Sequence, residues 1–462
     1  MKTSYSNGVL KTRVLPVKTT DLGHFADPKT LDKWEIQGDE IILAPLREAA
    51  ERLKTSSLPV GFPTETVYGL GADATRSEAV KGIYKAKGRP SDNPLIVHIC
   101  DLTMLRSLLG PSADGDPVPN IYKPLIKKFW PGPLTILLPN PKPSQLAPEV
   151  TAGLPSFGAR MPKSPLALSL IHLSGVPLAA PSANASTKPS PTSADHVLHD
   201  LDGRVEIILD GGPCQVGVES TVVDGLCDPP VVLRPGGVSI DDIRECEGWG
   251  GVVKGYKDQS EVGGAAPRAP GMKYKHYSPK ARVVLYEAAS LSNAGTENAY
   301  SGIPSEAAKL IAAKDVLDHI VNVGIVRTKN WGDWAGFNTT NSTTLRATVL
   351  KSQPIQTDHS FEMKQGELWG SDNCKSSTCP ADAATPNGLS TQARAPERHI
   401  ANLISISLGT DIKSIAHGLF SALRELDQRG VDVIYVEGIE DEGDIAAAVM
   451  NRLRKAASTI ER

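Results

Sequence analysis

Short apolar runs recur along the first half of the chain, and residues with helical spacing lie between several of them. Short runs bounded by turn residues are typical of buried strands, whereas apolar residues at helical spacing are typical of helices that cover a sheet. The pattern therefore predicts an α/β fold with a twisted, mixed sheet. We expect strands at 58–63, 95–99, 134–138, 176–180, 205–209, 221–223 and 231–233, and helices at 42–53, 79–86 and 166–173.

The chain of 462 residues is long enough for two domains. We place a first α/β domain at 1–248, a linker rich in Gly, Lys and Pro at 249–280, and a smaller Rossmann-like α/β domain at 281–462. In this last part the pattern predicts strands at 282–286, 320–325, 403–408 and 433–436, with helices at 305–317, 412–426 and 445–454. Residues 329–398 contain too few apolar side chains to pack alone, and we expect most of this segment to be a disordered insertion. Local docking of Phe361, Met363, Leu368 and Trp369 is the alternative for part of it.

Charge and cysteine content restrict the class of protein. The 49 basic and 52 acidic residues leave a net charge of −3, so any basic site must be local. The six cysteines lack the paired spacing of zinc ligands, which favours a reducing compartment. No membrane-spanning or secretory segment is evident, and we expect a cytoplasmic protein without membrane contact. The first 20 residues contain four cations and no acid, so mitochondrial targeting is an alternative.

The stretch "GIYKAKGRPSDNPLIVHI" (82–99) places Lys85, Lys87 and Arg89 just before a turn and a buried strand. Cations near the C-terminal end of a helix can simply stabilise its dipole. However, phosphate oxygens bind ammonium and guanidinium groups together with hydroxyl and amide donors, which Ser91 and Asn93 supply. Because the chain has no P-loop motif, we expect this stretch to hold the phosphates of a nucleotide.

The stretch "FPTETVYGLG" (62–71) contains Gly69 and Gly71 and resembles a dinucleotide-binding fingerprint when Ala74 is included. Its polar flank at 64–66 argues against that interpretation, since the strand of a Rossmann unit should still be apolar there. A glycine turn that packs a helix on the sheet is the alternative for the glycines. The threonine hydroxyls remain candidates for binding a small polar ligand.

Other polar residues also follow apolar runs. Arg160 comes after Gly158, Arg234 ends the strand expected at 231–233, and a Ser-rich loop follows the strand expected at 176–180. Ligand sites of α/β sheets gather at strand ends, so we expect these residues to share a site, although the Ser/Pro segment can also be a plain loop. The serine and asparagine candidates are Ser182, Asn184, Ser186, Ser190 and Ser220.

These stretches, with "PGPLTILLP", "FGARMP", "PLAAPSANASTKPSPTSADHV", "GVESTVVD", "VLRPGG" and "APGMKYKHYSP" in the same order, resemble the YrdC/Sua5 family in its two-domain Sua5 form. The resemblance implies a YrdC-like fold over 43–279, followed by a Sua5-type C-terminal domain. It also implies the synthesis of L-threonylcarbamoyladenylate and pyrophosphate from L-threonine, bicarbonate or CO2, and ATP. The product would serve a complex that makes N6-threonylcarbamoyladenosine at position 37 of tRNA.

The resemblance implies roles for individual residues. We expect Lys87 and Arg89 to be catalytic, by neutralising charge on the leaving pyrophosphate. Mg²⁺ is expected on the ATP phosphates without protein ligands of its own. The linker aromatic residues Tyr274, His276 and Tyr277 would form a lid, although they can also simply anchor the linker. Threonine would contact Thr66, His98, Arg160, Ala180 and Ser220, and ATP would contact Arg89, Asn93, Ser156, Ser182, Ser190, Arg234 and His276.

Two other functions stay open. The cations could grip an RNA backbone in a translation-associated module without catalysis, although the balanced charge and the lack of aromatic residues among the basic ones favour at most weak RNA binding. YrdC-like domains also occur in carbamoyl transferases that use carbamoyl phosphate, but we find no zinc-finger or acylphosphatase segment in this sequence.

Overall fold

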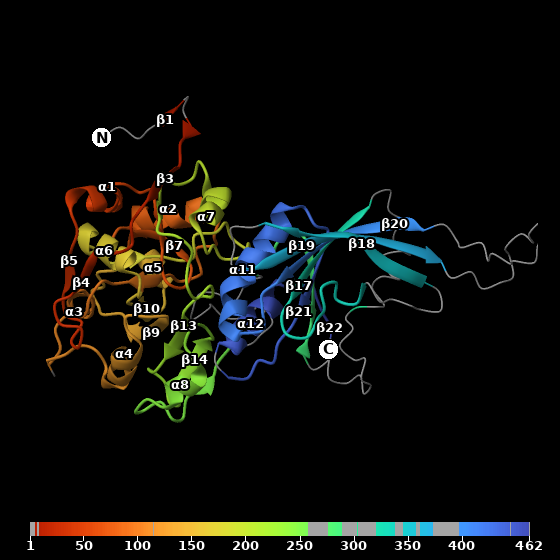
Figure 1. Ribbon diagram of the computed structural model, residues 1–462. Helices are drawn as coiled ribbons and strands as arrows, with labels where there is room; N and C mark the ends of the chain where they lie inside the picture. The colour runs from red at the N-terminus through yellow and green to blue at the C-terminus, as the bar shows by residue number, and fades with distance from the viewer. Residues whose placement is uncertain are drawn as a thin grey trace, which may run out of the picture. The chain divides into compact units, whose positions relative to one another are not determined.

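The computed structural model describes residues 5–6, 9–113, 115–256, 276–288, 303, 320–337, 345–356, 361–372, 397–443 and 445–461 (Figure 1). Their contacts divide the chain into two compact units. The first comprises Met1–Ser278, Leu419–Arg424 and Asp441–Ala456, and the second comprises Pro279–Gly418, Glu425–Glu440 and Ala457–Arg462.

The first unit is built on a mixed sheet in the order β15-β14-β13-β9-β10-β8-β11-β7-β6-β12-β3. β10 runs parallel to β8, whereas β11 is antiparallel to both of its neighbours, β8 and β7. The mixed sheet expected from the sequence is confirmed. Its strands are β3 (Arg13–Pro16), β6 (Val60–Pro63), β7 (Tyr68–Asp73), β8 (Ile96–His98), β9 (Leu134–Pro139), β10 (Ser156–Arg160), β11 (Leu178–Ala179), β12 (Ile207–Asp210), β13 (Thr221–Asp224), β14 (Val231–Arg234) and β15 (Val253–Lys254). Smaller strands are β1 (Tyr5–Ser6), β2 (Val9–Leu10), β4 (Gly23–Phe25) and β5 (Trp34–Ile36).

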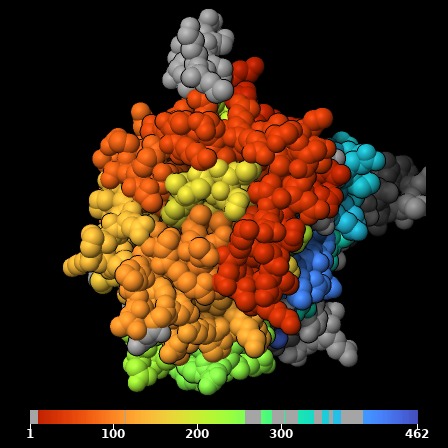
Figure 2. All heavy atoms as spheres, turned by 90° about the vertical axis from the view of Figure 1, so that its left-hand side faces the viewer, coloured from red at the N-terminus to blue at the C-terminus, as the bar shows by residue number. Residues whose placement is uncertain are grey.

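Helices cover the sheet through apolar faces. In α1, Asp39 caps the N-terminus by accepting a hydrogen bond from the Ile42 amide, and Leu43, Leu46 and Leu53 are buried. α6 packs against α1, and Figure 2 shows yellow residues set directly among red and orange residues on this face of the first unit. None of the described helices is long and apolar enough to cross a bilayer. The helices are α1 (Glu40–Thr55), α2 (Ser77–Lys87), α3 (Leu102–Leu109), η1 (Asn120–Tyr122), α4 (Lys123–Phe129), α5 (Pro148–Thr151), α6 (Pro165–Ser174), α7 (Ala194–Leu201) and α8 (Ile240–Arg244).

The glycines of "FPTETVYGLG" lie within strand β7 rather than in a turn. Gly71 pairs with Val60 of β6, and a Cβ atom at Gly71 would come within 2.7 Å of the Phe62 ring. The glycine-turn interpretation is therefore wrong. The missing side chains let the Phe62 ring pack closely against the neighbouring strand.

The sheet of the first unit extends beyond the expected domain boundary at 248. Trp249 is fully buried beside Tyr122, and its indole donates to the Ile121 carbonyl at 2.8 Å. β15 then pairs in parallel with β14. Residues 249–256 therefore complete the first unit instead of forming a linker.

The second unit contains a sheet in the order β18-β19-β20-β17-β21-β16-β22. Its pairings from β20 to β22 are parallel, whereas β18 and β19 add an antiparallel hairpin at one edge. The expected Rossmann-like sheet is thus confirmed, while the helix expected at 305–317 lies outside the described residues. The elements are β16 (Arg282–Tyr286), β17 (Val321–Arg327), β18 (Leu345–Ile355), β19 (Glu362–Asp372), β20 (Arg398–Ser407), α11 (Ile412–Gln428), β21 (Val433–Glu437) and β22 (Thr459–Glu461). Residues Leu419–Arg424 of α11 and the whole of α12 (Ala446–Ala456) are grouped with the first unit.

The segment 329–398 differs from the expected disordered insertion. β18 and β19 lie within it, and Met363 and Leu368 of β19 are buried. The prediction of disorder is wrong for these strands, because pairing with β20 supplies the hydrogen bonds and the core that the segment lacks alone.

Candidate active site

A cavity of about 250 Å³ lies in the first unit, among the ends of several strands and the loops that follow them. Most of the residues that the sequence singled out line it. The lining consists of Thr64, Thr66, Val67, Gly69, Lys87, Gly88, Arg89, Pro90, Asn93, Ile96, His98, Arg160, Ala180, Pro181, Ser182, Asn184, Ser186, Thr187, Ser190, Glu219, Ser220, Arg234, His276 and Tyr277. The structure thus brings the predicted strand-end residues Arg160 and Arg234 together in one cavity.

Arg160, at the end of β10, is held on three sides. Its Nε donates to the Gly132 carbonyl at 3.2 Å, Nη1 donates to Thr66 Oγ1 at 2.9 Å, and Nη2 donates to Glu65 Oε1 at 2.7 Å. Arg160 is only 4% exposed. A guanidinium has five N–H groups, so these bonds leave one on each terminal nitrogen. This pair of N–H groups suits a carboxylate.

Thr66 and His98 contribute hydrogen-bond acceptors near Arg160. Thr66 Oγ1 lies 2.8 Å from the Thr64 hydroxyl, which itself donates to the Val67 carbonyl. Burial and the neighbouring Arg160 charge lower the pKa of His98 to about 3, so the ring is neutral near pH 7. His98 Nδ1 lies 3.3 Å from the Ile96 carbonyl, which can only accept, so Nδ1 carries the proton and Nε2 is an acceptor.

Lys87 ends α2 and is buried. Its ammonium donates to the carbonyl oxygens of Ser182 and Asn184 and lies 3.4 Å from Asn184 Oδ1. Burial and the nearby Arg89 charge place the pKa of Lys87 well below its usual value. The side chain therefore fixes the loop after β11 while it lines the cavity. The neighbouring Lys85 is exposed and does not line the cavity, so it is not part of the cation cluster.

Arg89 and Asn93 present unsatisfied polar atoms. Arg89 Nη2 donates to the Pro94 carbonyl at 3.3 Å, but Arg89 Nε and Asn93 Oδ1 are buried without a hydrogen-bond partner among the described residues. Burial lowers the pKa of Arg89 to about 10, so it stays charged near pH 7. Orphaned buried groups of this kind are costly, and a bound ligand is one way to satisfy them.

Arg234 lies at the end of β14 and contacts Ser220. Its Nε and Nη2 donate to the Ser220 carbonyl at 3.1 and 2.9 Å, and Nη2 also lies 3.1 Å from Ser220 Oγ. The Ser220 hydroxyl is in turn 2.8 Å from Thr135 Oγ1. These bonds join the start of β13 to the cations of the cavity.

Glu219 is a lining residue that sequence reasoning missed. It accepts a hydrogen bond from Ser190 Oγ at 2.5 Å and another from Arg452 Nε at 3.0 Å, all within the first unit. Against the effect of burial, Arg452 and Arg234 hold the pKa of Glu219 down to about 2. Its position beside Ser220 in "GVESTVVDG" was the available signal, but nothing in the sequence places Ser190 and Arg452 next to it.

The expected lid is described in part. His276 and Tyr277 line the cavity, with ring centroids 5.5 Å apart, whereas Tyr274 lies outside the described residues. Burial lowers the pKa of His276 to about 3, and its Nε2 is buried without a partner among the described residues. The Ser278 amide donates to the Thr187 carbonyl at 2.8 Å, so this short segment is tied to the cavity wall.

Ser156 does not line the cavity. It begins β10 opposite Pro139 of β9, whereas the cavity lies at Arg160, the other end of the same strand. A contact between Ser156 and ATP therefore stays a prediction. Four residues of extended strand separate the two positions by more than 10 Å, at about 3.3 Å per residue.

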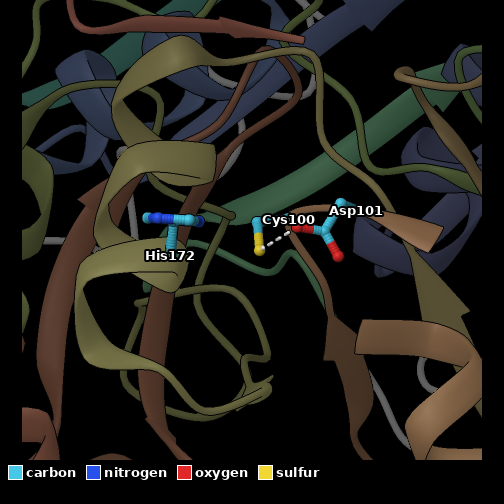
Figure 3. A group of neighbouring side chains, drawn as sticks. All are labelled: Cys100, Asp101 and His172. Carbon is cyan, nitrogen blue, oxygen red and sulfur yellow. Dashed lines mark hydrogen bonds between the residues drawn. The ribbon is translucent and has the colours of Figure 1, made fainter. Parts of the chain in front are cut away.

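A second cluster, formed by Cys100, Asp101 and His172, has the composition of a metal site (Figure 3). The Cys100 thiol contacts Asp101 Oδ2 at 3.4 Å, and Asp101 Oδ1 caps α3 by accepting from the Met104 amide at 2.8 Å. Burial raises the pKa of the Cys100 thiol. Helix capping accounts for the position of Asp101.

Comparison with known protein families accounts for most of the chain. The Sua5/YciO/YrdC family model, described as "Telomere recombination", matches residues 56–236, and the Sua5 C-terminal model, described as "Threonylcarbamoyl-AMP synthase, C-terminal domain", matches residues 238–458. A threonylcarbamoyl-AMP synthase of Schizosaccharomyces pombe is 42% identical, with 98% of each chain covered. One of Bacillus subtilis is 40% identical over 89% of this chain and 92% of that protein.

A solved structure supports the same family assignment as the sequence comparisons. Pyrococcus abyssi Sua5 complexed with L-threonine has a TM-score of 0.66 and 34% identity, covering 97% of this chain and 99% of that one. The α/β architecture of this chain thus has a counterpart in a protein that was solved with L-threonine bound. The chain belongs to the Sua5 family of threonylcarbamoyl-AMP synthases.

Proposed function

We propose that the protein joins L-threonine, bicarbonate or CO2, and ATP into L-threonylcarbamoyladenylate and pyrophosphate. The observation that carries this proposal is the single cavity that holds a buried guanidinium with two remaining N–H groups near other buried cations. The buried guanidinium of Arg160 suits an amino-acid carboxylate, and the other buried cations suit a triphosphate. The names of the relatives and the threonine complex of the Pyrococcus protein support the same activity.

The threonine would bind at the end of the cavity formed by Arg160, Thr66 and His98. Its carboxylate would take the two remaining N–H groups of Arg160 as a bidentate pair. Lone pairs of Thr66 Oγ1 and His98 Nε2 would accept hydrogen bonds from the amine or hydroxyl. Ala180 and Ser220 complete this end, and the small Ala180 side chain leaves space for the substrate.

The reaction needs no nucleophile from the protein. The threonine amine attacks the carbon of CO2, loses a proton and becomes a carbamate. A carbamate oxygen then attacks the α-phosphorus, and the bond to the bridging oxygen of the β-phosphate breaks, releasing pyrophosphate. The adenylyl group moves to a new acceptor, which makes the protein a nucleotidyltransferase. Its contribution is to position the reactants and to stabilise the charge that develops on pyrophosphate.

The triphosphate would meet the opposite end of the cavity. Arg89 supplies a charged Nε–H that has no partner among the described residues, and Arg234 supplies a second guanidinium. Lys87 would act together with the loop that it fixes, which carries Ser182 near the phosphates. Asn93 and Ser190 would complete the ATP contacts as neutral groups.

The cavity does not offer a set of protein ligands for Mg²⁺. Glu219 is the one carboxylate among the described lining residues, and it already pairs with Ser190 and Arg452. Mg²⁺ prefers several oxygen ligands and usually binds through phosphates and water. We therefore assign Mg²⁺ to the ATP phosphates as the counter-ion of the substrate.

A lid formed by His276 and Tyr277 would exclude water from the labile product. Both side chains already line the cavity, and His276 Nε2 has no hydrogen-bond partner among the described residues, so it is available to a ligand.

Because the product is labile, the enzyme that uses it to modify tRNA at position 37 would have to consume it promptly. Direct RNA binding is a weaker alternative, because the cations are enclosed in a cavity instead of spread over a surface.

One assay tests the proposed function. Pyrophosphate release should require ATP, threonine and bicarbonate together, and mass spectrometry should detect threonylcarbamoyladenylate. Release that proceeds equally without threonine would contradict the proposal. Tight binding of tRNA without any product would favour the RNA-binding alternative.

A further inference from the structure

Glu65 does not line the cavity, yet it contacts the residue proposed to bind the substrate carboxylate. It follows β6 and is 7% exposed. Its Oε1 accepts from Arg160 Nη2 at 2.7 Å, and Oε2 accepts from the Lys163 amide at 3.0 Å. The Glu65 backbone carbonyl also accepts from the Val216 amide at 2.8 Å. Both carboxylate oxygens and the backbone are therefore fixed.

These contacts determine where Arg160 can point. The Arg160 side chain is held through Gly132 on Nε, Thr66 on Nη1 and Glu65 on Nη2, and only Glu65 supplies a charge. Charged hydrogen bonds are stronger and more directional than neutral ones. Because Glu65 is itself tied to the Lys163 amide, the guanidinium plane is fixed relative to the chain that leaves β10.

The ion pair between Glu65 and Arg160 also changes the net charge at the threonine end of the cavity. An isolated buried guanidinium would attract any anion, including a phosphate, whereas Glu65 balances its charge. Binding then depends on two correctly oriented N–H groups more than on net charge. A planar carboxylate satisfies that geometry with two oxygens.

We infer that Glu65 is a positioning residue that orients Arg160 for the carboxylate of threonine. The inference rests on the proposed function. It concerns a residue that acts through Arg160 and does not touch the substrate.

The first experiment compares Glu65→Gln with the parent protein. The amide keeps the shape of the side chain, but it removes the charge and turns one acceptor into a donor that faces the Lys163 amide. The KM for threonine should rise about ten- to hundredfold, as expected when a buried charged pair is broken. The KM for ATP should change less than about twofold. Glu65→Asp keeps the carboxylate and should recover most of the threonine affinity.

The matched control is Glu206→Gln. Glu206 is also buried, at 3% exposed, and it pairs with Arg52 at 2.8 Å, but neither residue lines the cavity. This substitution should lower the melting temperature and leave the KM for threonine unchanged. A rise in threonine KM in both variants would mean that loss of any buried carboxylate loosens the site, which would overturn the inference.

A double substitution separates positioning from general stability. In the Arg160→Gln background, adding Glu65→Gln should change threonine binding less than about twofold, because the group that Glu65 orients is gone. If the two substitutions instead lowered threonine affinity independently, so that their fold-losses multiplied, the inference would be overturned. If Glu65→Gln does not fold, the same cycle is run with Glu65→Asp.

Calorimetry of threonine binding to the parent protein tests the proposed function separately. If the parent protein does not bind threonine, the proposed function is overturned. If the parent protein and Glu65→Gln bind threonine equally well, only the role of Glu65 is overturned.

Discussion

The two ends of the cavity differ in how far the protein satisfies their polar groups. At the threonine end, every nitrogen of Arg160 already has a protein partner, and Thr66 is bonded to Thr64. At the phosphate end, Arg89 Nε and Asn93 Oδ1 are buried and lack partners among the described residues. The first end is organised before its ligand arrives, whereas the second depends on its ligand to satisfy it. Substitutions at the two ends should therefore affect stability in opposite ways.

The largest expected effect follows from Arg160→Ala. Removing Arg160 takes away the two N–H groups for the substrate and costs about 2 to 5 kcal/mol, which corresponds to roughly thirtyfold to several-thousandfold weaker threonine binding. It also leaves the Glu65 carboxylate buried without its partner, so the melting temperature should fall. Calorimetry and thermal unfolding measure the two effects. Unchanged threonine affinity would remove Arg160 from the site.

Arg89→Ala is the counterpart at the phosphate end. ATP binding should weaken about ten- to hundredfold, the effect expected for one charged hydrogen-bonding group. Ligand-free stability should stay the same or rise, because the substitution removes a buried donor that none of the described residues satisfies. Titration with ATP and a melting curve without ligand check both points. A melting temperature that falls as far as in Arg160→Ala would contradict the contrast between the two ends.

The pH dependence of stability gives a third test. The folded-state pKa of His98 is about 3, below the ordinary histidine pKa of 6.5, so the unfolded chain binds the proton more readily between these values. The contribution of His98 is fully present above pH 6.5 and is lost as the pH falls toward 3. His98→Gln should reduce the slope of the free energy of unfolding against pH by up to about 1.4 kcal/mol per pH unit in that window. Urea unfolding at several pH values measures this slope, and an identical slope in both proteins would show that folding does not shift the pKa of His98.

The smallest expected effect is that of Lys85→Ala. Lys85 is exposed, whereas Lys87, two residues later, is buried in the cavity wall. ATP affinity in the Lys85 variant should stay within about twofold of the parent, since an exposed charge is largely screened. Lys87→Met serves as the comparison and should weaken ATP binding by releasing the loop at Ser182 and Asn184. Equal losses in both variants would restore Lys85 to the phosphate site.

The sequence alone determined the α/β class, because periodicity is local and survives without knowledge of contacts. It placed β8, β9 and β14 correctly and assigned Arg160 and Arg234 to one site, since strand-end position is visible in the chain. It singled out Asn93 because this amide follows the cations Lys87 and Arg89. It misjudged Gly69 and Gly71, because whether a glycine bends a strand or admits a neighbouring ring depends on Phe62.

Tertiary structure decided which polar groups meet. Ser156 and Arg160 share one strand, but only the end at Arg160 reaches the cavity. Lys85 and Lys87 share one helix end, but only Lys87 turns toward the Ser182 loop. The roles of Glu65 and Glu219 come from partners about 95 and 29 residues away. Such pairings depend on sheet order and register, which no local pattern encodes, and they decide whether a charge is paired, buried or available to a ligand.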